Sequence, residues 1–198
     1  RDAAAGRLTT TIEVADLAAC DLVIEAIVED ADAKRVLFAD LDRVCRADAV
    51  LATNTSALSV TAIAAATGSP ERVVGMHFFN PAPLMPLLEV VRGELSDERA
   101  LAVAVAVGER MGKTVVRCHD TPGFVVNRVL IPLLNDCVRV LDEARVAPED
   151  LDAAMRSGAG WPMGPCELVD LVGIDVHVHA AEALYEKLRE PRMAPPPR

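Results

Sequence analysis

The sequence has little positive charge and lacks any long apolar run. Its 198 residues carry 20 Lys and Arg against 30 Asp and Glu, which gives a formal net charge of −10. Nucleic acids and anionic membranes bind clustered Lys and Arg, so this balance argues against both as partners. The longest apolar run, Leu101 to Val107, is far shorter than the roughly 18–20 residues of a membrane span. Hydrophobic residues still make up 52%, enough for a real core.

Paired cysteines and a signal peptide are also lacking. The five cysteines lie at positions 20, 45, 118, 137 and 166, and no two form a C-x-x-C pair. This pattern supports neither a disulfide framework nor a zinc site, and we expect reduced thiols, no metal and a cytoplasmic location. The N-terminal residues have no signal-peptide layout. The start at Arg1 and the end in Met193-Ala-Pro-Pro-Pro-Arg198 suggest a piece of a longer protein.

Up to about residue 118, short apolar runs alternate with amphipathic stretches. Strand–helix–strand alternation of this kind predicts a parallel, doubly wound α/β sheet. Branched apolar runs predict strands over 22–27, 49–53, 73–77, 87–91 and 114–117, with a further one over 8–12. Helical apolar spacing predicts helices over 32–46, 57–67 and 97–113.

The pattern changes to helices alone after Cys118. A long helix is predicted to start at Thr121-Pro122-Gly123, with Pro122 in its first position, and to continue to Glu143. Further helices are expected over 148–156, from Pro165 to near Gly173, and from an Asp175 cap towards Arg189. The sequence therefore predicts an α/β domain over 1–118 followed by an all-helical domain over 119–198.

Polar residues follow the predicted strands, where open α/β sheets bind ligands. Glu29 follows the first strand, Asn54-Thr55-Ser56 follows the second, and His77 ends the third. Each also has an ordinary explanation, such as a helix cap or a structural histidine. Glu89 is more informative, because a carboxylate inside an apolar strand needs a partner. An acid beside an imidazole orients the ring and raises its basicity, so Glu89 and His77 form a plausible base pair.

Two other patterns leave alternatives open. Ser56, His77 and Glu89 could form a hydrolase triad, but the sequence has no G-x-S-x-G motif. Asn127 lies on an apolar helical stripe, where a single amide bonds either to the protein or to a ligand.

Six segments stand out in combination. They are Asp21-Leu-Val-Ile-Glu-Ala-Ile-Val-Glu29, Thr53-Asn-Thr-Ser56, Gly75-Met-His-Phe-Phe-Asn-Pro81, Leu88-Glu-Val-Val91, Asp120-Thr-Pro-Gly-Phe-Val-Val-Asn-Arg128 and Gly158-Ala-Gly-Trp-Pro-Met-Gly-Pro165. Together they closely resemble the NAD-dependent (S)-3-hydroxyacyl-CoA dehydrogenases, a group that includes bacterial 3-hydroxybutyryl-CoA dehydrogenases. The resemblance implies a partial Rossmann-type doubly wound sheet followed by a helical C-terminal domain.

The resemblance also implies roles for individual residues. His77 would be the catalytic base and Glu89 its partner, while Ser56 and Asn127 would contact the 3-oxygen of the substrate. The residues that would contact NAD are Ala26, Glu29, Lys34, Asn54, Ser56 and Asn80. The implied activity interconverts (S)-3-hydroxyacyl-CoA and 3-oxoacyl-CoA with NAD, as in fatty acid β-oxidation. The implied partners are an acyl-CoA substrate and a second copy of the chain, bound through the helical domain.

The sequence departs from the family pattern at its ends. No G-x-G-x-x-G occurs, so the family's pyrophosphate loop is expected outside this chain, which we take to be truncated at both ends. On this view the 198-residue chain binds NADH weakly. Two alternatives stay open: an inactive dimerisation or substrate module of a larger chain, and a related dehydrogenase of a hydroxy acid without CoA.

Overall fold

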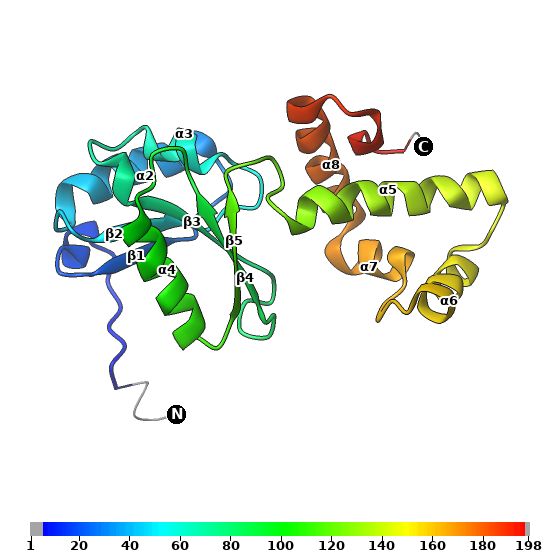
Figure 1. Ribbon diagram of the computed structural model, residues 1–198, viewed down its shortest axis with the longest axis horizontal. Helices are drawn as coiled ribbons and strands as arrows, with labels where there is room; N and C mark the ends of the chain where they lie inside the picture. Colours follow the sequence, from blue (N-terminus) through cyan, green and yellow to red (C-terminus); the bar gives the residue numbers. More distant parts are fainter. Residues whose placement is uncertain (1–5, 197–198) are drawn as a thin grey trace. The chain divides into compact units, whose positions relative to one another are not determined.

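The computed structural model describes residues 6–196, which form two compact units (Figure 1). Unit 1 ends at Asp120, and unit 2 begins at Thr121. Unit 1 contains a five-stranded sheet and its covering helices, whereas unit 2 is entirely helical. In the described ranges, no helix combines the length and the apolarity needed to cross a membrane.

The sheet of unit 1 has the spatial order β1-β2-β3-β4-β5. Its strands are β1 (Leu22–Glu25), β2 (Val50–Thr53), β3 (Val73–Phe78), β4 (Leu87–Arg92) and β5 (Thr114–His119). The strands β1, β2 and β3 are parallel, β4 runs antiparallel to β3, and β5 is parallel to β4. The prediction of a wholly parallel sheet is therefore wrong at β4. Residues 79–86 join β3 to β4 without a helix, and a parallel crossover needs about a dozen residues or more.

Helices cover both faces of this sheet. They are α2 (Ala31–Val44), α3 (Val60–Ala64) and α4 (Glu98–Arg110), with the short 3₁₀ turns η1 (Val14–Leu17) and η2 (Pro70–Arg72). Val74 and Met76 of β3 pack in the same core cluster as Leu101 of α4. Gly75 points the other way, so close to α3 that a Cβ would lie 2.9 Å from Cγ2 of Val60. Two covered faces explain why β2 is buried at every position.

The strand predicted over 8–12 is absent from the described structure. These residues lie outside the sheet, and Leu8 and Ile12 are 80% and 96% exposed. A strand requires a neighbour for its backbone groups, and this segment pairs with none of the described strands.

The described part of unit 2, residues 121–196, contains four helices and one 3₁₀ turn. They are α5 (Val126–Ala144), α6 (Pro148–Ala159), α7 (Pro165–Val172), α8 (Ile174–Leu188) and η3 (Pro191–Met193). The predicted start of α5 is wrong, because Gly123 and Phe124 have φ of +78° and +47°, which no right-handed helix can contain. The predicted cap of α8 is wrong as well: Gly173 is the N-cap, and Asp175 lies inside the first turn.

A buried polar pair fastens the end of unit 2 to α5. Asn135 is 0% exposed, and its Nδ2 donates to the carbonyls of Arg192, Met193 and Ala194. Its Oδ1 can only accept, so it receives the proton of His177 Nε2 at 2.9 Å. Burial lowers the pKa of His177 below its ordinary value. The lowered pKa favours a neutral imidazole in the buried contacts that join α8, α5 and the end of unit 2.

We predict that unit 2 loses stability as the pH falls below about 6.5. The folded pKa of His177 is lowered, so its contribution is complete above the unfolded pKa and is lost as the pH falls through the folded pKa. Fluorescence of Trp161, the single tryptophan, reports urea unfolding of this unit alone. The urea concentration at the unfolding midpoint should decrease as the pH is lowered from 7.5 to 5.5. This decrease should be smaller in His177→Gln. His179→Gln, on the exposed side of α8, should keep the wild-type pH dependence; an equal pH dependence in His177→Gln would refute the prediction.

Candidate active site

The polar residues singled out in unit 1 gather at one edge of the sheet. The parallel strands β1, β2 and β3 end at this edge, and β4 begins there because it runs antiparallel to β3. The loops that leave these strand ends carry Glu29, Asn54, Ser56 and Asn80. His77 is the second-last residue of β3. Carboxyl ends of parallel strands are where open α/β sheets place their ligand sites.

His77 and Glu89 form a buried pair across β3 and β4. They are direct partners in the antiparallel register, and His77 Nδ1 lies 2.7 Å from Glu89 Oε2. Glu89 is 0% exposed and His77 is 3% exposed. A carboxylate can only accept, so Nδ1 carries the proton and Nε2 presents its lone pair. The pairing proposed from the sequence therefore produces a correctly oriented proton acceptor.

Ser56 occupies the other side of the imidazole. Its Oγ lies 3.0 Å from His77 Nε2, and Ser56 is exposed, although Thr55 before it is buried. With Nδ1 protonated, the serine hydroxyl donates to Nε2. Ser56, His77 and Glu89 thus form one chain of hydrogen bonds that leads from the surface to a buried carboxylate. A ligand hydroxyl near Ser56 would meet the same lone pair.

The surroundings of Ser56 argue against a hydrolase. Acyl transfer requires backbone N–H groups directed at a developing oxyanion. Here the N–H groups of Ser56 and Ala57 donate to Glu29 Oε1 at 2.9 and 3.2 Å. A carboxylate where an oxyanion would form repels it, so the three-residue chain is suited to proton transfer and not to nucleophilic attack.

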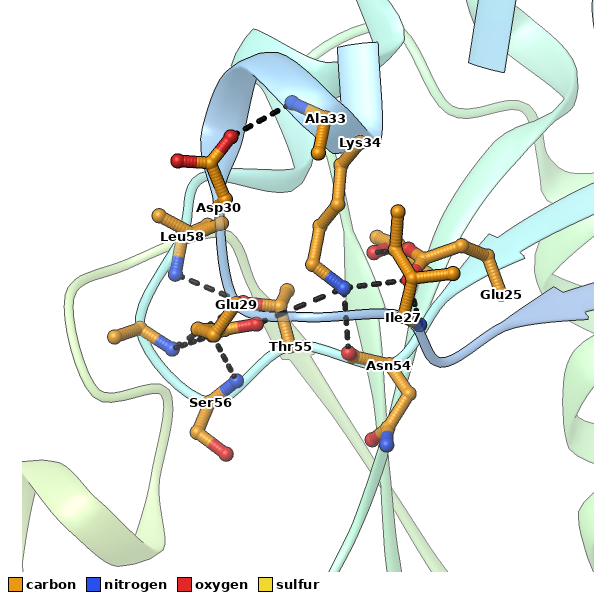
Figure 2. Close-up of polar contacts among 12 residues, drawn as sticks. Glu25, Ile27, Glu29, Asp30, Ala33, Lys34, Asn54, Thr55, Ser56 and Leu58 are labelled. Atoms are coloured by element: carbon orange, nitrogen blue, oxygen red, sulfur yellow. Dashed lines mark hydrogen bonds and ion pairs between the residues drawn. The ribbon is translucent and has the colours of Figure 1, made fainter. Parts of the chain in front are cut away.

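Glu29 organises the loop that carries Ser56, as Figure 2 shows. Besides the two backbone N–H groups, its Oε1 accepts from Thr55 Oγ1 at 2.5 Å. Thr55 Oγ1 in turn accepts from the N–H of Leu58 at 2.9 Å. One carboxylate in the loop after β1 therefore accepts three hydrogen bonds from the loop after β2.

Lys34 lies beneath this loop instead of on the surface. Its side chain is 0% exposed, and Nζ lies 2.6 Å from Glu25 Oε1 and 3.6 Å from Glu29 Oε2 (Figure 2). It also donates to the carbonyl of Asn54 at 3.1 Å. The predicted contact between Lys34 and NAD stays a prediction, and in this structure the ammonium has no surface to offer a ligand.

Glu25 is a residue whose part in the site the sequence did not reveal. Its carboxylate accepts from the ammonium of Lys34, from the hydroxyl of Thr53 at 2.7 Å and from the N–H of Ile27 at 2.6 Å. Its signal is the one that identified Glu89, an acid at the end of an apolar strand that must find a partner. The same argument predicts a buried partner for Glu25 as well as for Glu89.

The exposed groups at this edge fit the nicotinamide and ribose part of NAD. Ala26, Ser56 and Asn80 are exposed, and Ile27 and Val28 expose apolar surface beside them. Asn54 Oδ1 accepts from the N–H of Phe78 at 3.1 Å, and its other amide atom is a donor. Neutral donors, one partly exposed carboxylate and an apolar flank match an amide ring and ribose hydroxyls. Within residues 6–196, no cluster of three or more His, Cys, Asp or Glu could hold a metal ion.

The structure brings three of the four predicted catalytic residues together in unit 1. The fourth, Asn127, belongs to unit 2, where it lies half-buried in the first turn of α5. Its predicted place at the substrate oxygen stays a prediction.

Two family models together match almost the whole chain. Residues 1–121 match the NAD binding domain of 3-hydroxyacyl-CoA dehydrogenase, and residues 123–198 match its C-terminal domain. The chain belongs to the 3-hydroxyacyl-CoA dehydrogenase family. The resemblance stated from the motifs is confirmed, and so are the Rossmann-type fold class, the oxidoreductase class and the NAD cofactor.

Individual relatives agree with the family models. A 3-hydroxybutyryl-CoA dehydrogenase of Mycobacterium tuberculosis is 47% identical over 100% of this chain and 70% of its own length. A 3-hydroxyadipyl-CoA dehydrogenase of Escherichia coli is 52% identical over 86% of this chain and 36% of its own. The crystal structure of FadB2 from M. tuberculosis superposes with a TM-score of 0.95 at 46% identity, covering 99% of this chain and 70% of that one.

We predict that Gly75→Ala will loosen the His77–Glu89 pair. Gly75 is paired with Val91 in the same ladder, and a Cβ there would lie 2.7 Å from Cβ of Val91. Overpacking of this kind costs about 1–3 kcal/mol, and it would push β3 and β4 apart. Urea unfolding, followed by the amide signals of β3, measures the loss of stability. The ¹⁵N signal of His77 Nδ1 measures the change in its hydrogen bond to Glu89.

The matched control is Gly158→Ala, since a Cβ at Gly158 in α6 meets nothing within 4 Å. That change should be neutral or slightly stabilising, by up to about 1 kcal/mol. A Gly75→Ala variant with wild-type stability and an unchanged His77 signal would contradict the close approach.

Proposed function

We propose that His77 is the general base of an NAD-dependent oxidation of (S)-3-hydroxyacyl-CoA to 3-oxoacyl-CoA. The observation that carries the proposal is the hydrogen-bonded chain from Ser56 through His77 to the buried Glu89. It provides one proton acceptor at the ligand edge of an NAD-binding sheet. The family membership supplies the reaction class.

His77 would accept the proton of the 3-hydroxyl at Nε2 while the hydride leaves C3. Bound NAD⁺ supplies the hydride acceptor for this step. Glu89 holds the ring by its Nδ1–H and stabilises the imidazolium that results, because its carboxylate is buried beside the new charge. In the reverse direction the imidazolium returns the proton to the 3-oxygen.

Ser56 would position the substrate oxygen. Its hydroxyl already donates toward Nε2, so a 3-hydroxyl at the same place can bond to both groups. A donor directed at the oxygen where charge develops stabilises the transition state more than the ground state. Asn127 would act on the same oxygen as a second donor, as the family motif implies.

The nicotinamide half of NAD would be held by the exposed groups at the edge. We assign it to the backbone at Ala26 and to the side chains of Glu29, Asn54, Ser56 and Asn80. Lys34, for which the family motif also implies an NAD contact, would support the site through the carbonyl of Asn54 and the carboxylate of Glu29.

The substrate class follows from the relatives. The names 3-hydroxybutyryl-CoA dehydrogenase and 3-hydroxyadipyl-CoA dehydrogenase share a 3-hydroxyacyl thioester of CoA. We therefore propose an acyl-CoA substrate, as opposed to a free hydroxy acid. We also propose a cytoplasmic homodimer that pairs through unit 2, where several apolar side chains are exposed: Leu133, Val140, Leu171, Val172 and Ile174.

We predict that His77→Gln lowers kcat by about 10²–10⁴-fold, since the variant has no group to take the proton. NADH oxidation by acetoacetyl-CoA is measured with the 198-residue chain, and again with any residues that its gene encodes on either side. His119→Gln is the control, because His119 is exposed on β5 and contacts none of the proposed site residues.

Near-wild-type turnover in His77→Gln would refute the base assignment. Faster turnover of free 3-hydroxy acids than of CoA thioesters would refute the substrate class. Binding of acetoacetyl-CoA without turnover in either form would favour a substrate-binding module over an enzyme.

A further inference from the structure

Lys34 is the most deeply buried cation among residues 6–120, and its ammonium contacts groups at the site edge. Its ammonium contacts Glu25 at 2.6 Å, the carbonyl of Asn54 at 3.1 Å and Glu29 at 3.6 Å. The Lys34 side chain is 0% exposed and that of Glu25 is 1% exposed, whereas that of Glu29 is 41% exposed. The ammonium of Lys34 therefore contacts one buried carboxylate, that of Glu25, and one partly exposed carboxylate, that of Glu29.

A buried ion pair is weak evidence for a purely stabilising role. Removing two charges from water costs so much that apolar substitutes are often as stable. Glu25 alone could be satisfied by Thr53 and the N–H of Ile27. The additional contacts of Lys34 reach outward, to the carbonyl of Asn54 and to Glu29, and those two groups hold the start of the loop that carries Ser56.

The far end of this loop is fastened separately. The carboxylate of Asp120 accepts from Ser59 Oγ at 2.7 Å and from the N–H of Thr61 at 2.8 Å. Ser59 is the N-cap of α3, so this contact fixes where the helix begins. The contacts of Lys34 and Glu29 therefore hold the first part of the loop, from Asn54 to Ala57, and Ser56 lies in that part.

We propose that Lys34 is a positioning residue that holds Ser56 against His77 through the carbonyl of Asn54 and the carboxylate of Glu29. The ammonium attracts the Glu29 carboxylate, which in turn accepts from the N–H of Ser56 at 2.9 Å. This places Ser56 Oγ at 3.0 Å from His77 Nε2. The inference rests on the proposed function for its catalytic meaning, but not for its geometry.

The test uses the 198-residue chain without NAD or substrate. Two signals are measured by NMR: hydrogen exchange of the Ser56 amide, and the ¹⁵N signal of His77 Nε2. Urea midpoints are measured in parallel from amide signals of β2. In Lys34→Met the Ser56 amide should exchange faster by about tenfold or more. This factor corresponds to the weakening of a hydrogen bond to a charged acceptor. The Nε2 signal should shift as the serine hydroxyl moves away.

The double variant Glu25→Gln with Lys34→Met separates positioning from simple charge neutralisation. It removes both buried charges, so the urea midpoint should return towards the wild-type value. The Ser56 exchange and the His77 signal should stay altered, because no ammonium then contacts the carbonyl of Asn54 or the carboxylate of Glu29. Return of both signals together with the midpoint would overturn the proposal, since Lys34 would then be only the counter-ion of Glu25.

A third variant keeps the test decisive if the buried substitutions fail to fold. Glu29→Ala removes the outer carboxylate and leaves the Lys34–Glu25 pair intact, so the midpoint should hold while Ser56 exchanges faster. Unchanged exchange would overturn the proposal. The matched control is Asp32→Asn with Arg35→Gln, an exposed pair on α2, which should alter none of the signals.

The same measurements distinguish the positioning role of Lys34 from a role in NAD contact alone and from a failure of the proposed function. If Lys34 acted only by contacting NAD, Lys34→Met would weaken NADH binding and leave both signals of the ligand-free protein unchanged, which would overturn the positioning role. A failure of the proposed function would appear instead as normal turnover in His77→Gln.

Discussion

Glu89 is a carboxylate held out of water in the middle of an apolar strand, and its need for a hydrogen-bond donor governs the geometry of unit 1. The nearest strand can supply that donor only if His77 lies directly opposite, which the antiparallel register of β3 and β4 achieves. The imidazole is then fixed by its Nδ1, and its Nε2 is turned toward the sheet edge where the loop after β2 begins. Burial of one charge thus sets the direction of the proton acceptor.

The same edge contains a second buried carboxylate with a different partner. Glu89 is paired with the imidazole of His77, whose second ring nitrogen is turned toward Ser56, whereas Glu25 is paired with the ammonium of Lys34. The first pair is suited to moving a proton and the second to holding a constant charge. The loop from Asn54 to Ser59 lies between the two pairs, so one carboxylate serves the chemistry and the other serves the scaffold around it.

Much of this site could be predicted from the sequence because strand ends and isolated acids are local signals. The spacing placed Glu29, Ser56 and His77 after strands, and the apolar context of Glu89 predicted its pairing with His77. The direction of β4 was predicted wrongly, since direction depends on the length of the connection over 79–86 and not on the strand's own residues. The burial of Lys34 was missed because a lysine on an amphipathic helix resembles a surface residue until its neighbours are known. The late start of α5 depends on two left-handed residues, and one of them, Phe124, gives no sign of that in the sequence.

The antiparallel ladder of β3 and β4 separates the lasting part of the site from the part that can vary. The distance between His77 and Glu89 is set by strand pairing and by the close packing of Gly75 on Val91. None of these groups lies in the connection 79–86, so substitutions there remove none of the contacts that hold the pair. Side chains of that connection other than Asn80 can therefore change, and with them the ligand surface that it offers, without moving the base away from its carboxylate. Such an arrangement allows a family to change what it recognises while it keeps one reaction.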